Sequence, residues 1–336
     1  MKTRIIAYGL GIAALLAALF SASTQGKASA ATCTPTGFFR DSINMTAALI
    51  NPPGTVSGNV DATGCNIGVY YDNGKKGDVN GANIHGANYF GVVVNGDVNR
   101  VSVDVQNSNI HDIGETPLNG TQHGVGIYYR ALGTTGATSG KIWNNTLTNY
   151  QKGGIVANGN TNVDVKGNTV TGQGPVLYIA QNGIQLGYGA SGQVQRNTVT
   201  GNAYSGTNFA SSGGILVVGG DCYGGALTTG VQIDNNTLIG NDVGVYLSNL
   251  NAACAAPATA TNIKVINNTI TNNGATNISG NGATGYQAGV SDVGNNDKII
   301  NNNISGAGYT ACLPNFCTAI DADTSFTNRP KVHANN

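Results

Sequence analysis

Charged side chains are scarce in this sequence. Asp, Glu, Lys and Arg make up 10% of the 336 residues, against about 25% in typical soluble domains. The 16 basic and 16 acidic residues cancel, so the chain lacks the positive surface with which proteins bind nucleic acid or an anionic membrane. We therefore expect no nucleic-acid partner, and a surface covered by Asn, Thr, Ser and Gly.

Long apolar runs are missing after residue 30. The chain begins with basic residues, stays apolar over residues 5–20 and reaches Ala28-Ser29-Ala30, the small-x-small pattern that signal peptidase cleaves. A transmembrane anchor is the alternative, but this run is shorter than the about 20 apolar residues that span a bilayer. We expect a signal peptide over residues 1–30, a secreted and soluble mature protein, and no membrane insertion.

A two-block motif recurs along the rest of the chain. The second block reads "GGIVA" (153–157) and "NGIQL" (182–186), and the first block reads "VDVKGNTVTG" (163–172), "GQVQRNTVTG" (192–201), "VQIDNNTLIG" (231–240) and "IKVINNTITN" (263–272). Apolar and polar residues alternate within the first block, as Val163 and Val165 alternate with Asp164 and Lys166. This period of two indicates half-buried β-strands rather than helices. The repeat unit is therefore strand, turn, strand and loop.

A single repeat is too small to bury its own apolar face, so the repeats must stack. We predict an all-β fold, a single-stranded parallel β-helix of about eight to ten coils over residues 61–323. Equivalent positions then form ladders along the axis. One interior ladder contains Val170, Val199, Leu238, Ile270 and Ile304, and a second contains the buried amides of Asn145, Asn168, Asn197, Asn236, Asn268 and Asn302. Stacked amides can bond to one another and to turn backbone.

Other positions of the repeat have expected structural roles. The glycines of the second block, Gly154, Gly183, Gly214 and Gly244, should supply a bend before the second strand. Residues 31–60 should form an N-terminal cap, with a short helical turn within 41–54 that ends at Pro52 and Pro53. The Cys312–Cys317 loop and a strand at 319–323 should close the other end, and residues 324–336 should form a frayed tail.

The six cysteines all follow the predicted signal peptide. No C-x-x-C spacing occurs, which argues against zinc, and an even number in an exported chain favours disulfides. Fifteen pairings are possible. We predict the pairing of neighbours along the chain, because each bond then joins the same or adjacent coils: Cys33 with Cys65, Cys222 with Cys254, and Cys312 with Cys317.

The alternation of "NNTIT"-like and "GI-V"-like blocks resembles the right-handed β-helix repeat of the pectin-lyase-like superfamily and of NosD-type periplasmic proteins. The resemblance covers roughly residues 60–323 and implies a right-handed helix. Members of this superfamily include pectate lyases, polygalacturonases, alginate lyases and epimerases. Their signatures D-D, R-I-K, R-x-P-x-x-R and D-P-H do not occur in this chain, so no catalytic residue can be carried over by motif. Fold alone does not decide function.

Titratable side chains gather in the first coils, which makes this region the candidate site. His85 and His111 follow equivalent isoleucines and should stack on one outward ladder. A lyase acting on an acidic polysaccharide needs a cation beside the uronate carboxylate and a base that removes the C5 proton. The predicted catalytic residues are His111, His123, Tyr128, Arg130 and Lys152, and the predicted substrate-binding residues are His85, Asp112, Glu115, Asn158, Gln185 and Tyr188.

The leading hypothesis is a secreted, monomeric β-helix that binds an acidic polysaccharide, either without cleaving it or as a lyase that cleaves it by β-elimination, with no cofactor required. The alternative is a non-catalytic adhesive or structural protein of the cell surface. A more remote hypothesis is ice binding through outward Thr-x-Thr pairs such as Thr169/Thr171 and Thr198/Thr200. Calcium could bind at Asp/Asn-rich turns, although no nonapeptide calcium repeat is present. Asp104, Lys141 and Asp164 are expected to form an alternating charge ladder on neighbouring strands.

Overall fold

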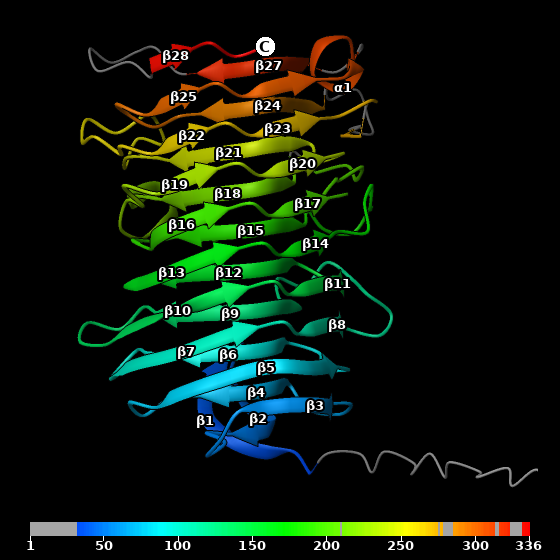
Figure 1. Ribbon diagram of the computed structural model, residues 1–336, viewed down its shortest axis with the longest axis vertical. Helices are drawn as coiled ribbons and strands as arrows, with labels where there is room; N and C mark the ends of the chain where they lie inside the picture. Colours follow the sequence, from blue (N-terminus) through cyan, green and yellow to red (C-terminus); the bar gives the residue numbers. More distant parts are fainter. Residues whose placement is uncertain (1–31, 209, 275, 278–284, 313–315, 323–330) are drawn as a thin grey trace, which may run out of the picture.

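The computed structural model describes residues 32–208, 210–274, 276–277, 285–312, 316–322 and 331–336. The predicted signal peptide lies outside this range. Strands stack one above another along a single long axis, and the chain climbs from one end of the stack to the other (Figure 1). The predicted all-β parallel solenoid is confirmed.

Sheet A provides one face of the solenoid. All of its neighbouring strands pair in parallel except β1 and β2, which form an antiparallel hairpin. Its strands, in spatial order, are β1 (Thr34–Arg40), β2 (Ile43–Ile50), β4 (Ile67–Tyr71), β6 (Phe90–Asn95), β9 (Val125–Ala131), β12 (Gly153–Gly159), β15 (Asn182–Gly187), β18 (Gly213–Gly219), β21 (Val243–Asn249), β24 (Tyr286–Asp292) and β27 (Phe316–Ala322).

Sheet B forms two parallel rows that meet at a turn. Strand β5 (Lys76–His85) pairs with both rows, and β3 (Val56–Asp61) pairs with β5. The first row continues with β7 (Arg100–Gln106), β10 (Ala137–Trp143), β13 (Thr161–Lys166), β16 (Ser191–Gln195), β19 (Gln232–Asp234), β22 (Lys264–Ile266), β25 (Lys298–Ile300) and β28 (Lys331–His333). The second row continues with β8 (Asn109–Ile113), β11 (Thr146–Tyr150), β14 (Thr169–Thr171), β17 (Thr198–Thr200), β20 (Thr237–Ile239), β23 (Thr269–Thr271) and β26 (Asn303–Ser305).

The interior is one continuous apolar core between sheets A and B. The predicted ladder from Val170 to Ile304 is in register through every strand pair of the second row. Four of its five side chains have no exposed surface. Burial of this kind contributes about 25 cal/mol for each Å² of apolar surface removed from water, which favours the stacked arrangement.

The predicted asparagine ladder is also present, at the turn between the two rows of sheet B. Its six side chains are each 1% exposed. The Oδ1 of Asn145 accepts from the backbone N–H of Ser108, and each later Oδ1 accepts from the backbone N–H of the preceding ladder asparagine, at 2.9 Å from Asn168 to Asn197. Each Nδ2 donates inward to a carbonyl, as that of Asn197 does to Val165. The residue before the ladder asparagine has φ of 55° at Asn144 and 57° at Asn235. Asn tolerates this left-handed conformation, which explains the recurring Asn-Asn pair.

The second-block glycines do not form the predicted bend. Gly154, Gly183 and Gly214 lie inside strands of sheet A, and none has a positive φ. A Cβ added to Gly154 would lie 2.6 Å from the carbonyl oxygen of Gly183, and one added to Gly183 would lie 2.6 Å from that of Gly214. Glycine recurs here because adjacent coils approach one another too closely for a side chain.

The predicted helical turn within residues 41–54 is wrong, because residues 43–50 form β2. This strand pairs with β4, so tertiary hydrogen bonding decides the local conformation. The hairpin places Phe38 over the outer face of sheet A, 6.1 Å from the ring of Tyr70 and 6.3 Å from that of Phe90 between centroids. It therefore buries apolar side chains that a solvent-facing strand would expose.

The C-terminal end also differs from prediction. Residues 331–333 form β28, which pairs with β25, and Asn335 Oδ1 accepts from the backbone N–H of Asn302 at 2.9 Å. The described part of the predicted tail therefore adds another rung to the stack. The predicted strand at 319–323 lies within β27, apart from residue 323, which is outside the described residues. The short helices η1 (Asp221–Tyr223) and α1 (Ala307–Thr310) were not predicted.

All three predicted disulfides are present: Cys33–Cys65, Cys222–Cys254 and Cys312–Cys317. The first attaches the N-terminal hairpin to the coil above it, and the second joins the loops that follow β18 and β21. Among the described residues, no helix is both long and apolar enough to cross a membrane.

Candidate functional site

A column of outward side chains crosses sheet A along the solenoid axis. Strand register places equivalent side chains one above another on adjacent strands, in the order Tyr128, Val156, Gln185, Leu216, Tyr246 and Ser291. Because adjacent strands lie about 4.8 Å apart, the column provides an evenly spaced surface. It forms the floor of the candidate site.

Two cavities lie along this column and meet at Lys152. One, of about 360 Å³, is lined by Arg40, Phe90, Gln122, Val125, Tyr128, Leu132, Lys152, Val156, Asn158, Gln185 and Tyr188. The other, of about 410 Å³, is lined by Lys152, Ala180, Asn182, Asn208, Ala210, Ser211, Leu216, Tyr246, Asn277 and Tyr286. We call these two cavities together the sheet A groove. The groove follows the solenoid axis and has polar walls over a mixed floor.

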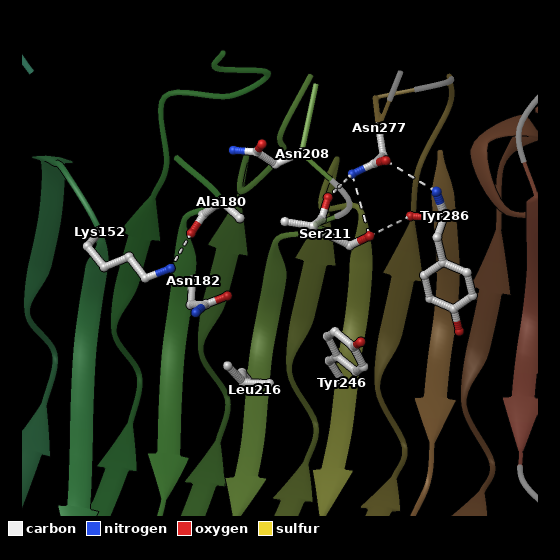
Figure 2. Close-up of a pocket in the computed structure, with 10 residues that line it drawn as sticks. Lys152, Ala180, Asn182, Asn208, Ser211, Leu216, Tyr246, Asn277 and Tyr286 are labelled. Carbon is white, nitrogen blue, oxygen red and sulfur yellow. Dashed lines mark hydrogen bonds between the residues drawn. The ribbon is translucent and has the colours of Figure 1, made fainter. Parts of the chain in front are cut away.

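Lys152 stands at the junction of the two cavities. Figure 2 shows its side chain extending along the groove toward Ala180, with Leu216 and Tyr246 on the strands beyond. Its Nζ donates to the carbonyl oxygen of Ala180 at 2.7 Å. Burial lowers the pKa of the Lys152 ammonium to about 8, because the charged form loses hydration. A substantial fraction of this amine is therefore neutral in mildly alkaline solution.

Buried glutamines hold the loops that wall the groove. Gln151 accepts from the backbone N–H groups of Glu115 and Asn119 at 3.1 and 3.2 Å and donates to Thr121. Gln181 accepts from Gln173 N at 2.8 Å, and Gln287 accepts from Thr276 N at 2.9 Å. All three glutamines have no exposed surface. Each satisfies backbone groups that an irregular loop would otherwise leave unpaired.

Asp242 performs the same task for the wall of the second cavity. Its Oδ2 accepts from the backbone N–H groups of Tyr204 at 2.8 Å and Ser212 at 2.9 Å and from Asn277 Nδ2 at 3.2 Å, while its Oδ1 accepts from Thr276 Oγ1 at 2.8 Å. Burial raises the pKa of this carboxyl to about 6, although the four hydrogen bonds oppose that rise. Two loops from different coils therefore depend on one carboxylate.

The structure brings together five of the eleven predicted site residues. Tyr128, Lys152, Asn158, Gln185 and Tyr188 line the same cavity. Gln185 Nε2 donates to Asn158 Oδ1 at 3.0 Å, which orients both amides. Tyr128 is only 3% exposed, because its ring stacks on Phe90 at 5.2 Å, so it projects less freely than predicted.

Three other predicted residues lie on sheet B, outside the groove. His85 and His111 are in register and stack with ring centroids 5.2 Å apart, as the predicted outward ladder requires. His111 Nδ1 lies 2.6 Å from Asp112 Oδ2. A hydrogen bond from Asn149 and the neighbouring His111 lower the pKa of Asp112. These side chains form a local polar network that does not face Lys152 across the groove.

The remaining three predicted residues, Glu115, His123 and Arg130, are engaged in side-chain contacts outside the groove. His123 Nε2 lies 2.7 Å from Glu115 Oε1, and its ring stacks on Tyr89 with centroids 3.7 Å apart. His123 is 4% exposed, so a polymer has little access to it. Arg130 pairs with Asp97 and lies over the Phe38 ring at 4.7 Å from its centroid. The two contacts of Arg130 therefore hold the loop after β6, which contains Asp97, and the N-terminal hairpin, which contains Phe38, against β9.

Several residues of the groove were missed by sequence reasoning. Arg40 and Gln122 enter it from the hairpin and from the loop before β9, and Arg40 Nη2 donates to the carbonyl oxygen of Gln122 at 3.4 Å. Neither position belongs to the repeat. Gln151, Gln181, Asp242 and Gln287 do carry a signal, because each is a polar residue two or three positions before the second-block glycine. This signal marks the positions where a buried side chain accepts hydrogen bonds from the backbone of a loop.

The described residues do not bring three or more His, Cys, Asp or Glu side chains together as metal ligands. The groove side chains instead offer hydrogen-bonding amides, phenol rings, one amine and one guanidinium. Such a set can bind a hydroxyl-rich chain, neutralise a carboxylate and accept a proton at Lys152.

The comparisons with known proteins agree with this architecture. The family model "Right handed beta helix region" matches residues 49–222. Searches of curated proteins and of solved structures returned no match. The matched residues cover more than half of the chain and include the strands from β3 to β18. This chain is therefore a member of the right-handed β-helix family.

Proposed function

We propose that the sheet A groove binds an acidic polysaccharide, with a uronate carboxylate placed between Arg40 and Lys152. The observation that carries this proposal is the meeting of two cavities at a half-buried lysine, along the axis of the solenoid. An extended sugar chain parallel to that axis would contact several strands in succession. The three disulfides suit an oxidising compartment, so we place this activity outside the cell. The proposal takes the protein to act as a monomer.

The chemistry of the groove matches that of a sugar chain. Tyr188, Tyr246 and Tyr286 provide aromatic faces for pyranose rings, and the amides of Asn158, Gln185 and Asn182 provide donors and acceptors for hydroxyl groups. Glycoside hydrolysis normally uses two carboxylates at a defined separation. The described residues that line the two cavities include no Asp or Glu. The groove therefore supports binding and β-elimination better than hydrolysis.

In the proposed elimination, the neutral amine of Lys152 accepts the C5 proton of the uronate. The electron pair of that C–H bond forms the C4–C5 double bond, the bond from C4 to the glycosidic oxygen breaks, and the leaving oxygen takes a proton from water. The guanidinium of Arg40 stabilises the carboxylate as negative charge spreads onto it. The lowered pKa of Lys152 makes this amine available near neutral pH.

The test combines binding and product formation on polygalacturonate and alginate. Lys152→Gln should weaken binding about tenfold and abolish unsaturated products, which are measured by ultraviolet absorbance. Lys76→Gln, which changes an exposed lysine outside the groove, is the matched control. The elimination rate of the unaltered protein should rise as the pH passes through about 8, because only the unprotonated amine accepts a proton.

Other outcomes select among the alternatives. Binding that depends on Lys152, with no product from any polyuronide, would leave a binding protein without catalysis. No binding to any polysaccharide would contradict the proposal and favour an adhesive or structural role. An unchanged affinity in Lys152→Gln would remove the groove from the binding site.

Ice binding is a second candidate, because strand register does align the Thr-x-Thr pairs. Thr146, Thr169, Thr198, Thr237 and Thr269 form one outward column on the second row of sheet B. In the neighbouring column, Ile239 replaces threonine between Thr200 and Thr271. An ice-recrystallisation assay decides this candidate: inhibition that is lost in Thr171→Tyr would support it, and no inhibition would exclude it.

A further inference from the structure

Three lysines lie in register on the outer face of sheet B, near the C-terminal end of the solenoid. Lys264 on β22 is the parallel partner of Lys298 on β25, which is the partner of Lys331 on β28. These strands lie next to one another in the upper part of Figure 1. Lys264 and Lys331 are exposed, and Lys298 is half-buried. We call this set the lysine ladder.

Like charges directly opposite each other on adjacent strands destabilise a sheet, so such a column needs compensation. The N-terminal half of the same row has it. Lys141 pairs in register with Asp164, and the ammonium groups of Lys141 and Lys166 lie 4.8 and 5.3 Å from the ring centroid of Trp143. Among the described residues, no ion pair or ring contact involves a member of the lysine ladder.

We propose that the lysine ladder binds an acidic polysaccharide that runs parallel to the solenoid axis. Adjacent parallel strands place equivalent side chains about 4.8 Å apart, so the ladder presents a regular row of positive charges. A polyuronide carries one carboxylate on each pyranose ring, so it presents a regular row of negative charges. The whole chain has no net charge, so this local charge does not reflect general basicity. Bound carboxylates would supply the compensation that the fold does not.

The side chains beside the ladder favour a polysaccharide over a nucleic acid. Proteins that bind single strands combine basic residues with aromatic rings on which the bases stack. The outward residues two positions further along the same strands are Ile266, Ile300 and His333, and the rung before Lys264 is Gln232. None is Phe, Tyr or Trp, and Gln232 can bond to sugar hydroxyl groups.

This inference goes beyond the proposed function and does not depend on it. The groove lies on the outer face of sheet A, whereas the ladder lies on the outer face of sheet B. The two faces could hold two separate chains of the same polymer, or two segments of one long chain. A soluble β-helix with both sites would bind a polymer network at two places.

The experiment measures the affinity of the full chain, with its disulfides intact, for polygalacturonate at low ionic strength. Lys152→Gln is the background, so that groove binding does not mask the ladder. In this background, K264Q/K298Q/K331Q should bind about tenfold more weakly and lose most of the salt dependence, because three ion pairs with the polymer are removed. K75Q/K76Q/K166Q has the same net charge and should stay within twofold of the background.

Three results would overturn the proposal. The first is an equal loss in the control variant, which would indicate an effect of net charge alone. The second is unchanged affinity in the ladder variant, with matching thermal unfolding curves as evidence that both variants fold. The third is duplex DNA that binds and displaces polygalacturonate, which would assign the ladder to nucleic acid.

A trimer of galacturonate, but not the monomer, should compete with the polymer, because three carboxylates are needed to meet three lysines. The elimination activity of the chain with Lys152 intact should not change in the ladder variant, which separates this proposal from that for the groove.

Discussion

At the scale of single residues, Asp297 is a buried carboxyl beside another carboxyl. It has no exposed surface, and its Oδ1 accepts from the backbone N–H of Ile263 at 2.6 Å and from Thr261 Oγ1 at 2.7 Å. Burial, followed by the charge of Asp292, raises the pKa of Asp297 to about 8. At neutral pH the folded protein therefore keeps a proton on this pair that the unfolded chain releases.

This proton makes stability depend on pH in a definite direction. The unfolded carboxyl titrates near 3.8 and the folded one near 8, so the contribution of Asp297 is complete below about pH 4 and is lost as the pH rises to about 8. Asp297→Asn keeps both acceptor bonds and should remove most of this slope, leaving the variant more stable than the unaltered chain at pH 8. Urea unfolding at several pH values between 4 and 8 measures how the free energy of unfolding depends on pH. The exposed Asp221→Asn serves as the control, and a slope that persists in Asp297→Asn would contradict the assignment.

Asp242 is the residue on which the shape of the groove depends most. Asp242→Ala would leave four donors from two loops without their acceptor, and a buried unpaired donor costs about 1–3 kcal/mol. We expect the free energy of unfolding to fall by about 2–4 kcal/mol, since the loops relax in part. Polygalacturonate affinity should fall with it, because Asn208, Ser211 and Asn277 would lose their positions. Affinity retained in a folded Asp242→Ala protein would show that the second cavity does not bind the polymer.

At the scale of the repeated elements, the asparagine ladder should be the most sensitive feature. Asn197 lies in its middle, donates to Asn236 and to the carbonyl of Val165, and accepts from Asn168. Asn197→Ala should lower the free energy of unfolding by about 2–4 kcal/mol, because partners on both sides remain buried and unpaired. Asn162→Ala, at an exposed strand position, should change it by less than about 0.5 kcal/mol. Equal effects in urea unfolding would contradict an interior ladder held by hydrogen bonds.

Elements that repeat could be predicted from the sequence, and elements that occur once could not. The ladder asparagines and apolar positions return in every coil, so stacking alone brings them into register. The hairpin of residues 34–50 has no such copy, and its strands are decided by pairing with β4. The same difference explains the site. Tyr128, Lys152 and Gln185 belong to the repeat or lie beside it, whereas Arg40 reaches the groove only because the hairpin folds over sheet A.

At the scale of the whole molecule, the two ends of the stack differ from its middle. An inner strand such as β18 has a hydrogen-bonded neighbour on each side, but β1, at the N-terminal edge of sheet A, pairs only with β2 among the described strands. The ends of a solenoid therefore open more readily than its centre. The Cys33–Cys65 bond acts at this weak point, because it fixes the start of the hairpin to the loop before β4.

The position of a disulfide, rather than the length of its loop, should decide what its removal exposes. Cys33–Cys65 and Cys222–Cys254 both close loops with a sequence separation of 32, so the chain-entropy estimate is similar for both, about 3–4 kcal/mol. In hydrogen-exchange mass spectrometry, C33S/C65S should speed exchange over residues 34–60, because the hairpin can then open at the end of the stack. C222S/C254S should leave the strands β18 and β21 protected, since both keep two parallel neighbours and lose only a tie between their loops. Faster exchange of β18 and β21 in C222S/C254S, with the hairpin unchanged in C33S/C65S, would show that the disulfides rather than the stacked strands hold the centre of the solenoid together.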